Sequence, residues 1–246
     1  MNRAKGYIPR NYKRQPLGSI PYTTAFNLPA ISKSEWPDLI DYKKEKKARL
    51  IDVINAAELP VLDQDGFPFC WAYGYVTNLR VARAKAGIPY RHLNPHAIAC
   101  IRTGYRKRGG NTFDLPKLMA EFGCPTYDVW PKYSMDRSLA KSDAVKRDAI
   151  QYRHTEHYEL DPNDFEQKAV SLLNDIAVTA GYSHMSHMMC DIELIYKKSG
   201  GGYTFGTKHL NSWGAGYKDN GVGQFYGRKA VSFDQLAIKV GTVNPI

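Results

Sequence analysis

The sequence predicts an α+β fold with two lobes, because helix patterns fill its first part and strand patterns fill its last part. Apolar positions recur at helical spacing between residues 34 and 173, and Pro or Gly marks the ends of these runs. From Ala177 onward, short β-type runs alternate with glycine-rich turns, as in IAVTAGY, CDIELIY, GYTFGTKHL and GQFYGR. This alternation indicates an antiparallel sheet. A cleft between two such lobes is a common place for a functional site.

The first 58 residues are expected to form a basic extended arm followed by an amphipathic helix. Residues 1–35 are rich in Pro, Tyr and basic side chains and show little periodicity, which is typical of an arm rather than a packed element. We expect this arm to lie across its own domain or to bind a partner. Ser34 and Pro37 then open a helix, and the charged stretch Asp38–Ala57 has the apolar spacing of one amphipathic helix.

Residues 59–246 are expected to form the main domain. Further helices are predicted from apolar spacing and stop signals at Cys70–Ala86, Asn94–Ile101, Leu115–Phe122 and Asp161–Leu173, the last one capped by Asp161. Residues 132–148 are polar and are predicted to be irregular. These signals place a helical lobe at about residues 65–150 and a β lobe at about residues 151–246.

The chain has 246 residues, 43% of them hydrophobic, so it can build a sizeable core. Its formal net charge of +10 favours acidic partners, either an acidic protein or, as a weaker alternative, nucleic acid; solubility alone is the other interpretation. No apolar run approaches the roughly 18 residues that cross a bilayer, and the basic N-terminus lacks the apolar core of a secretion signal. We therefore expect no membrane span.

The four cysteines are scattered, with no close CxxC pair: Cys70, Cys100, Cys124 and Cys190. In a chain of this length, such spacing does not indicate a disulfide scaffold. We expect free thiols in a reducing, cytoplasmic compartment.

The stretch VLDQDGFPFCWAYG places Cys70 just after a Gly-Phe-Pro loop, at the first turn of a predicted helix. Unpaired N–H groups and the helix dipole at that position favour a thiolate. A nucleophilic cysteine also needs a base, usually a histidine held by a third group. The β-rich half offers His184, His187 and His209.

His187 begins a strand-like run, and its imidazole could face Cys70 from a strand end. The amide oxygen of Asn211, in HLNSWGAGY, could accept the imidazole N–H and fix the tautomer. Trp213 could cover that hydrogen bond. The amide of Gln64 could join the Cys70 N–H in stabilising an oxyanion.

The order Gln-x5-Cys-Trp, Gly-Gly, His and Asn-Ser-Trp-Gly resembles that of the papain-like cysteine proteases, over about residues 59–230. Gln64, Cys70 and Trp71 match the oxyanion glutamine, the nucleophile and the tryptophan after it. Gly109 and Gly110 resemble the glycines that hold substrate backbone. The resemblance implies a papain-like two-lobed fold, a Cys-His-Asn site, a peptide or protein substrate and no cofactor or metal.

Three further stretches, IPRNYKRQPLGSIPY, SEWPDLI and TYDVWPKYSMDR, look like a papain-like subgroup found in phages and bacteria. This looser resemblance implies a phage-encoded protein, which could be incorporated in a virion with the basic arm as an assembly contact.

The sequence departs from the family at Pro68-Phe69, where Gly-Ser is common, and this bulk is expected to narrow the cleft. Phe67 stands where a disulfide cysteine often lies. The residues ahead of the domain are too short and Pro-rich for the usual long inhibitory propeptide.

Three functions follow as hypotheses. The first is an active cysteine peptidase that uses Cys70, His187, Asn211 and Gln64, with Gly109, Gly110, Trp71 and Trp213 contacting the substrate. The second is a weak or inactive papain-fold binding protein of a virion. The third is a Cys-His amidase acting on peptidoglycan peptides.

Two alternatives concern the histidines. His184 competes with His187 as the base. If SHMSHMMC were helical, His184, His187 and Cys190 would share a face and could bind zinc.

Overall fold

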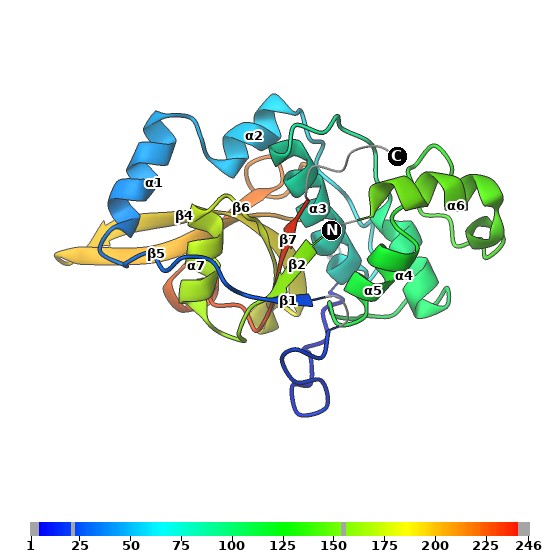
Figure 1. The fold of residues 1–246 in the computed structure, drawn as a ribbon, viewed down its shortest axis with the longest axis horizontal. Coiled ribbons are helices and arrows are strands. Elements are labelled where there is room, and N and C mark those ends of the chain that lie inside the picture. Colours follow the sequence, from blue (N-terminus) through cyan, green and yellow to red (C-terminus); the bar gives the residue numbers. More distant parts are fainter. Residues whose placement is uncertain (1–4, 21–22, 154–155, 241–246) are drawn as a thin grey trace.

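The computed structural model describes residues 5–20, 23–153 and 156–240 (Figure 1). The helices between residues 95 and 152 gather at one side of the molecule and a twisted sheet forms the other, with α3 (Cys70–Lys85) between them. Helix α3 contacts strands of the sheet on one side and neighbouring helices on the other. The predicted α+β class is confirmed.

The helical lobe is built by four helices and two 3₁₀ turns: α3, α4 (Pro95–Thr103), α5 (Leu115–Glu121), η1 (Leu139–Lys141), α6 (Asp143–Ala149) and η2 (Ile150–Tyr152). Asn94 caps α4, since its side-chain oxygen accepts the N–H groups of His96 and Ala97 at 3.1 and 3.3 Å. Gly123, after α5, has a φ of +83°, as its predicted role as a stop requires.

The sheet of the described residues has seven strands in the order β1-β2-β7-β3-β4-β5-β6. Only β1–β2 is a parallel pair; the others are antiparallel. The strands are β1 (Thr23–Ala25), β2 (Glu156–Glu159), β3 (Val178–Tyr182), β4 (His187–Ser199), β5 (Gly202–Leu210), β6 (Val222–Tyr226) and β7 (Asp234–Lys239). The short turns are η3 (Ser183–Met185) and η4 (Gly227–Ala230). Helices α1 (Trp36–Glu45) and α7 (Phe165–Leu173) contact β4, and so does α2 (Leu50–Ala56).

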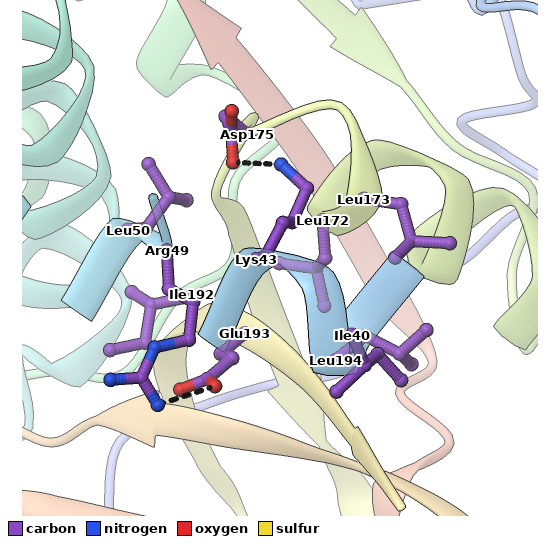
Figure 2. Close-up of a pocket in the computed structure, with 10 residues that line it drawn as sticks. All are labelled: Ile40, Lys43, Arg49, Leu50, Leu172, Leu173, Asp175, Ile192, Glu193 and Leu194. Atoms are coloured by element: carbon purple, nitrogen blue, oxygen red, sulfur yellow. Dashed lines mark hydrogen bonds and ion pairs between the residues drawn. The ribbon is translucent and has the colours of Figure 1, made fainter. Parts of the chain in front are cut away.

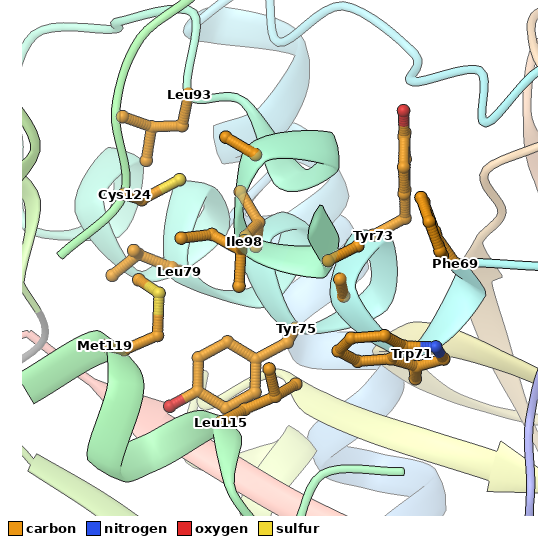
Figure 3. Close-up of a cluster of buried hydrophobic side chains, with 14 of the residues drawn as sticks. Phe69, Trp71, Tyr73, Tyr75, Leu79, Leu93, Ile98, Leu115, Met119 and Cys124 are labelled. Atoms are coloured by element: carbon orange, nitrogen blue, oxygen red, sulfur yellow. The ribbon is translucent and has the colours of Figure 1, made fainter. Parts of the chain in front are cut away.

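Helix α3 is buried on every side from Cys70 to Val81. Its aromatic and aliphatic side chains form the largest hydrophobic cluster with side chains of α4 and α5, as Figure 3 shows. On the sheet side, the Asn78 Nδ2 donates to Ala177 O, Thr179 Oγ1 and Leu236 O at 3.1 to 3.2 Å. Because Cys70 is the first residue of the same helix, these bonds of Asn78 position Cys70 relative to strands β3 and β7.

Three predicted elements differ from the structure. The stretch 38–57 forms two helices instead of one, because the chain turns at Lys47, with a φ of +51°. Residues 132–148 are not irregular throughout, since α6 begins at Asp143. Helix α7 begins at Phe165 and its cap is Asp164 rather than Asp161, since the Asp164 carboxylate accepts two backbone N–H groups.

We call residues 5–20 the arm. Gly6, Tyr7, Arg10 and Ile20 are buried against the chain's own domain, whereas most of residues 11–18 are exposed and loop away from it (Figure 1). Arg10 is 2% exposed and forms an ion pair with Glu159 of β2. Its guanidinium also donates to Gln15 O at 2.8 Å and lies 4.6 Å from the Tyr12 ring. These contacts of Arg10 hold the arm against the domain, because separating Arg10 from Glu159 would leave an uncompensated buried charge.

None of the helices in the described residues is long and apolar enough to cross a membrane.

Candidate active site

Cys70 is the first residue of α3 and is completely buried. The loop before it reverses direction at Asp65 and Gly66, which have φ values of +45° and +73°. Four backbone N–H groups face its sulfur, from Met188, Gly6, Trp71 and Cys70 itself. The sulfur therefore lies at a helix start that faces the first residues of β4, as the sequence predicted.

The expectation of a thiolate at this helix start is wrong for the observed state. Burial raises the pKa of the Cys70 thiol to about 12, although the surrounding N–H groups act to lower it. Desolvation outweighs the N–H groups because Cys70 is completely buried; Gly6 of the arm is one of the four donors. In this state the sulfur is a neutral thiol.

His187 and Asn211 meet beside this cysteine's helix. The His187 Nε2 and the Asn211 Oδ1 are 2.7 Å apart. The same Oδ1 accepts the Ser212 N–H at 2.7 Å, so it is an acceptor and the imidazole N–H lies on Nε2. Trp213 covers the pair, with its ring centroid 4.3 Å from that of His187.

The other ring nitrogen of His187, Nδ1, is buried and has no hydrogen-bond partner in the described residues. No hydrogen bond therefore joins Cys70 Sγ and His187 Nδ1 in the observed state. Burial lowers the pKa of His187 to about 4, and the Asn211 bond only partly opposes this shift. The imidazole is neutral, with its acceptor nitrogen unprotonated.

Gln64 is anchored next to the same residues. Its Nε2 donates to Phe67 O at 2.6 Å, and its Oε1 accepts from the Ser212 hydroxyl at 2.5 Å. A backbone bond from Gln64 N to Ser212 O, 2.9 Å, closes the contact. Ser212 thus links the Gln64 loop to the Asn211 segment, a role that the sequence analysis missed although Ser212 lies inside the Asn-Ser-Trp-Gly motif.

Gly110 holds the arm as a short parallel bridge. Its N–H donates to Gly6 O at 2.8 Å, and its carbonyl accepts from Ile8 N at 2.9 Å. A side chain at Gly110 would meet Trp71, and one at Gly109 would meet Gly6 O. Gly109 therefore allows close approach of another backbone, here the chain's own arm, whereas Gly110 leaves room for the Trp71 ring.

The other histidines lie apart from this group. His184 is exposed in η3, with its ring against Tyr182 and Phe225. His209 is buried in β5, and its Nε2 lies 3.1 Å from the Tyr217 hydroxyl. Of these three candidate histidines, His187 is the one that contacts Asn211.

The helical arrangement required for a zinc site does not form, because Cys190 lies with His187 in strand β4. Within residues 5–20, 23–153 and 156–240, no three His, Cys, Asp or Glu side chains gather as metal ligands. All four cysteines are free and buried.

The Pro68-Phe69 departure has a different effect from the expected one. The Phe69 ring is completely buried against Phe67, Trp71 and His96, so it fills the core of the helical lobe (Figure 3). Pro68 contributes its carbonyl, which a side chain at Gly6 would strike. The Pro68-Phe69 pair therefore affects the site through the backbone of Pro68, while the Phe69 ring packs in the core.

Phe67, at the position where the family often has a disulfide cysteine, makes a different link. The Lys107 ammonium lies 4.4 Å from the centre of the Phe67 ring. Because Lys107 precedes Gly109-Gly110 closely, this cation–π contact joins the glycine loop to the loop before Cys70.

A separate hollow lies between α1, α2, α7 and β4, away from these residues (Figure 2). Two ion pairs border it, Lys43–Asp175 at 2.6 Å and Arg49–Glu193 at 3.4 Å. It shares no residue with the group around Cys70 and presents no nucleophile.

The chain has the papain-like α+β fold. Helices come first and a largely antiparallel sheet follows, with the buried cysteine at the start of the central helix. No family model and no curated protein sequence matches the chain.

Solved structures of cysteine proteases do match. Xylellain, from Xylella fastidiosa, matches with a TM-score of 0.64 at 15% identity, over 98% of this chain and 99% of its own. Bromelain from Ananas comosus gives 0.62 at 17% identity, over 78% and 98%. Digestive procathepsin L 3 from the larval midgut of Tenebrio molitor gives 0.60 at 13% identity, over 74% of this chain and 66% of its own. At these identities the likeness establishes the fold.

Proposed function

We propose that this protein is a papain-like cysteine peptidase that hydrolyses peptide bonds of peptide or protein substrates through Cys70, His187, Asn211 and Gln64. One observation carries the proposal. The 2.7 Å contact between His187 Nε2 and Asn211 fixes a tautomer whose other nitrogen is a buried acceptor without a partner. That acceptor adjoins Met188, whose N–H faces the Cys70 sulfur.

The first half of the reaction forms an acyl-enzyme. Cys70 passes its proton to His187 Nδ1, and the thiolate attacks the carbonyl carbon of the scissile bond. The oxyanion accepts hydrogen bonds from the Cys70 N–H and the Gln64 amide. Protonated His187 then gives its proton to the leaving amine as the C–N bond breaks, which leaves a thioester on Cys70.

The second half releases the acid. His187 removes a proton from water, which attacks the thioester carbonyl, and the thiol is restored when the C–S bond breaks. Asn211 keeps the imidazole in the tautomer that both halves need, and Trp213 shields their hydrogen bond. Trp71 and the glycines Gly109 and Gly110 hold substrate backbone.

The arm must leave before this chemistry begins. The group of the arm that faces the Cys70 sulfur is the backbone N–H of Gly6. The sulfur cannot attack an N–H group, since attack requires a carbonyl carbon. The arm also uses both hydrogen-bonding groups of Gly110. The observed state is therefore a closed one, in which burial raises the pKa of the Cys70 thiol and lowers the pKa of the His187 imidazole, so the proton stays on sulfur.

The same closed state favours a second candidate function, a binding protein with a papain-like fold and little activity. In that case the arm would stay in place and Cys70 would remain a buried thiol. The looser likeness to phage and bacterial relatives makes a virion component the specific form of this candidate. Four free, buried thiols support a reducing compartment such as the cytoplasm for either function.

Peptide cleavage by the full chain carrying Gly6→Ala tests the proposal. The new methyl group collides with Pro68 O, so it displaces the arm from Cys70 while the rest of the chain is retained. We expect this variant to cleave unstructured protein such as casein, and expect Cys70→Ala in the same background to abolish cleavage.

Cys100→Ala is the matched control, because Cys100 is also a completely buried free thiol but lies in α4. It should leave cleavage unchanged. If the Gly6→Ala chain is folded and open to peptide yet cleaves nothing, the binding protein is the better interpretation.

A further inference from the structure

A second hollow, separate from the group around Cys70, is lined by three arginines. It lies where the end of α2 packs against α3, and the segment that joins α3 to α4 borders it (Figure 1). Arg80 and Arg83 come from α3, and Arg91 comes from the joining segment. The other lining residues are Tyr90 and six apolar residues, Ala57, Leu59, Ala84, Ile88, Pro89 and Leu93. The lining therefore carries positive charge and no acidic side chain.

Arg80 is the buried member of this group, with 4% of the residue exposed. Its Nη2 donates to Pro60 O at 2.8 Å and to the Tyr90 hydroxyl oxygen at 3.3 Å. Its Nε is buried and has no hydrogen-bond partner in the described residues. An arginine keeps its positive charge in proteins, and it is almost never fully buried without a paired anion.

Arg83 and Arg91 add to the same positive charge. Arg83 is half-buried, with its guanidinium 5.1 Å from the centre of the Tyr152 ring, and Arg91 is exposed. Burial lowers the pKa of Arg83, and the positive charge of Arg91 lowers it further. The two guanidiniums therefore repel each other, and an anion between them would remove this repulsion.

Carboxylates do not neutralise these arginines. The ion pairs within residues 5–20, 23–153 and 156–240 include none of the three. Asp128 and Asp148 act on Tyr152, but they are not among the charges that act on Arg83. The Asp148 carboxylate also accepts the Thr126 N–H at 2.6 Å.

The other neighbours of Arg80 are uncharged at neutral pH. Burial raises the pKa values of Tyr90, Tyr127 and Cys124, so their phenol and thiol groups keep their protons. Because the Tyr90 oxygen accepts from Arg80, its own hydrogen is available to a ligand. The hollow therefore has donors for an anion and lacks the anion itself.

We propose that the hollow lined by Arg80, Arg83 and Arg91 binds a phosphate group through guanidinium N–H donors and the Tyr90 hydroxyl. The planar fork of an arginine matches the oxygens of phosphate. A phosphate carries more negative charge than a single carboxylate, which suits a site of three cations. This inference does not depend on the proposed peptidase function.

Isothermal titration calorimetry of the full chain with inorganic phosphate tests the proposal, with sodium chloride holding the ionic strength constant. We expect a single bound phosphate, and a Tm that rises with phosphate concentration because the ligand binds the folded state. Phenyl phosphate separates two sources of the ligand. Binding of inorganic phosphate alone would indicate the free anion, and binding of phenyl phosphate as well would indicate the phosphate group of a larger molecule.

Arg83→Gln and Arg91→Gln should each weaken phosphate binding by about tenfold or more, because each removes charge-assisted hydrogen bonds. Both side chains lie outside the buried core, so the variants should fold, which circular dichroism checks. Arg228→Gln is the matched control, since it removes the same charge from an exposed position in η4 of the β lobe. It should change Kd by less than about twofold, because salt screens a distant exposed charge.

Two results would overturn the site. The first is that the full chain binds neither inorganic phosphate nor phenyl phosphate. The second is that Arg228→Gln weakens binding as much as Arg83→Gln does, since the attraction would then come from the net charge of the molecule. Neither measurement involves cleavage, so the Cys70→Ala chain should give the same Kd.

Discussion

His187 owes its orientation to Asn211, whose Oδ1 accepts both the imidazole N–H and the Ser212 N–H at 2.7 Å. The imidazole would otherwise be free to hold its proton on Nδ1, which is the nitrogen that accepts the Cys70 proton in the proposed reaction. At the scale of single residues, the proposal gives Asn211 control of the tautomer of the base and gives His187 the transfer of the proton.

Asn211→Ala in the Gly6→Ala chain should lower kcat by roughly 100-fold and change KM little, because the base loses its tautomer while substrate contacts remain. Steady-state kinetics on one peptide measure this. Asn174→Ala is the matched control, since the Asn174 Nδ2 bonds only Val170 O after α7, at 2.8 Å. An unchanged kcat for Asn211→Ala would mean that His187 needs no partner.

The two candidate bases can be separated in the same background. His187→Ala should abolish cleavage, whereas His184→Ala should retain it within about twofold, because His184 is exposed and its ring packs against Tyr182 and Phe225. Initial rates on a fluorogenic peptide distinguish them. Loss of activity with His184→Ala and its retention with His187→Ala would reverse the assignment of the base.

At the scale of elements, α3 positions the cysteine and the β3–β7 strands hold α3. Asn78 makes this connection through three donor contacts from one Nδ2. Their acceptors lie on β3, β7 and the residue before β3, so removing Asn78 leaves several buried acceptors unsatisfied.

Asn78→Ala should lower the free energy of unfolding by about 2–4 kcal/mol, since each buried group left unpaired costs about 1–3 kcal/mol. Urea denaturation followed by circular dichroism measures it. Thr204→Ala, at a half-buried position of β5, is a control that should change stability by less than about 1 kcal/mol. A change within that limit for Asn78→Ala would mean that α3 does not depend on these bonds.

The elements also show what the sequence could predict. The starts of α3 and α4 were predictable because local signals, a loop before Cys70 and a capping Asn94, determine them. The break at Lys47 and the capping of α7 by Asp164 were not, because several nearby residues offered similar signals and tertiary packing selects among them. Strand β1 was missed for the same reason, since only its pairing with β2 makes it a strand.

The candidate site divides in a similar way. Motif order sufficed to bring His187 and Asn211 together, and the structure has them in contact. Motif order did not predict that Gly6 contacts Cys70, because a segment without periodicity gives no signal of the surface on which it packs. The burial of Phe69 was equally unpredictable from the sequence, since it depends on packing against the rings of Phe67 and His96.

At the scale of the whole molecule, burial of neutral histidines links stability to pH. Burial lowers the pKa values of His96, His187 and His209 from 6.5 to about 4. Between these pH values the unfolded chain binds more protons than the folded one, so stability is lost as the pH falls from about 6.5 towards 4. Tm should therefore drop across this range.

His96→Phe should make that drop smaller. His96 lies among the rings of Phe67, Phe69 and Tyr133, and neither of its ring nitrogens has a hydrogen-bond partner. Phenylalanine therefore fits the site and removes one proton-binding group from the unfolded chain. Thermal melts of both proteins between pH 7 and pH 4 check this, and parallel curves would show that His96 does not contribute.

The whole chain also determines whether the site is open, because an arm fixed by Arg10 and Glu159 on β2 places Gly6 against Cys70 in the helical lobe. The central claim is that Cys70 is an activated nucleophile once the arm leaves. Its most direct test is the rate at which an epoxide thiol reagent alkylates each of the four cysteines, read by peptide mass spectrometry.

We expect one adduct, on Cys70, which forms slowly in the natural chain and much faster with Gly6→Ala. Adding His187→Ala should suppress this adduct. Cys100, Cys124 and Cys190 are equally buried free thiols and serve as internal references. If Cys70 in the Gly6→Ala chain reacts no faster than these three, the proposed catalytic site is contradicted.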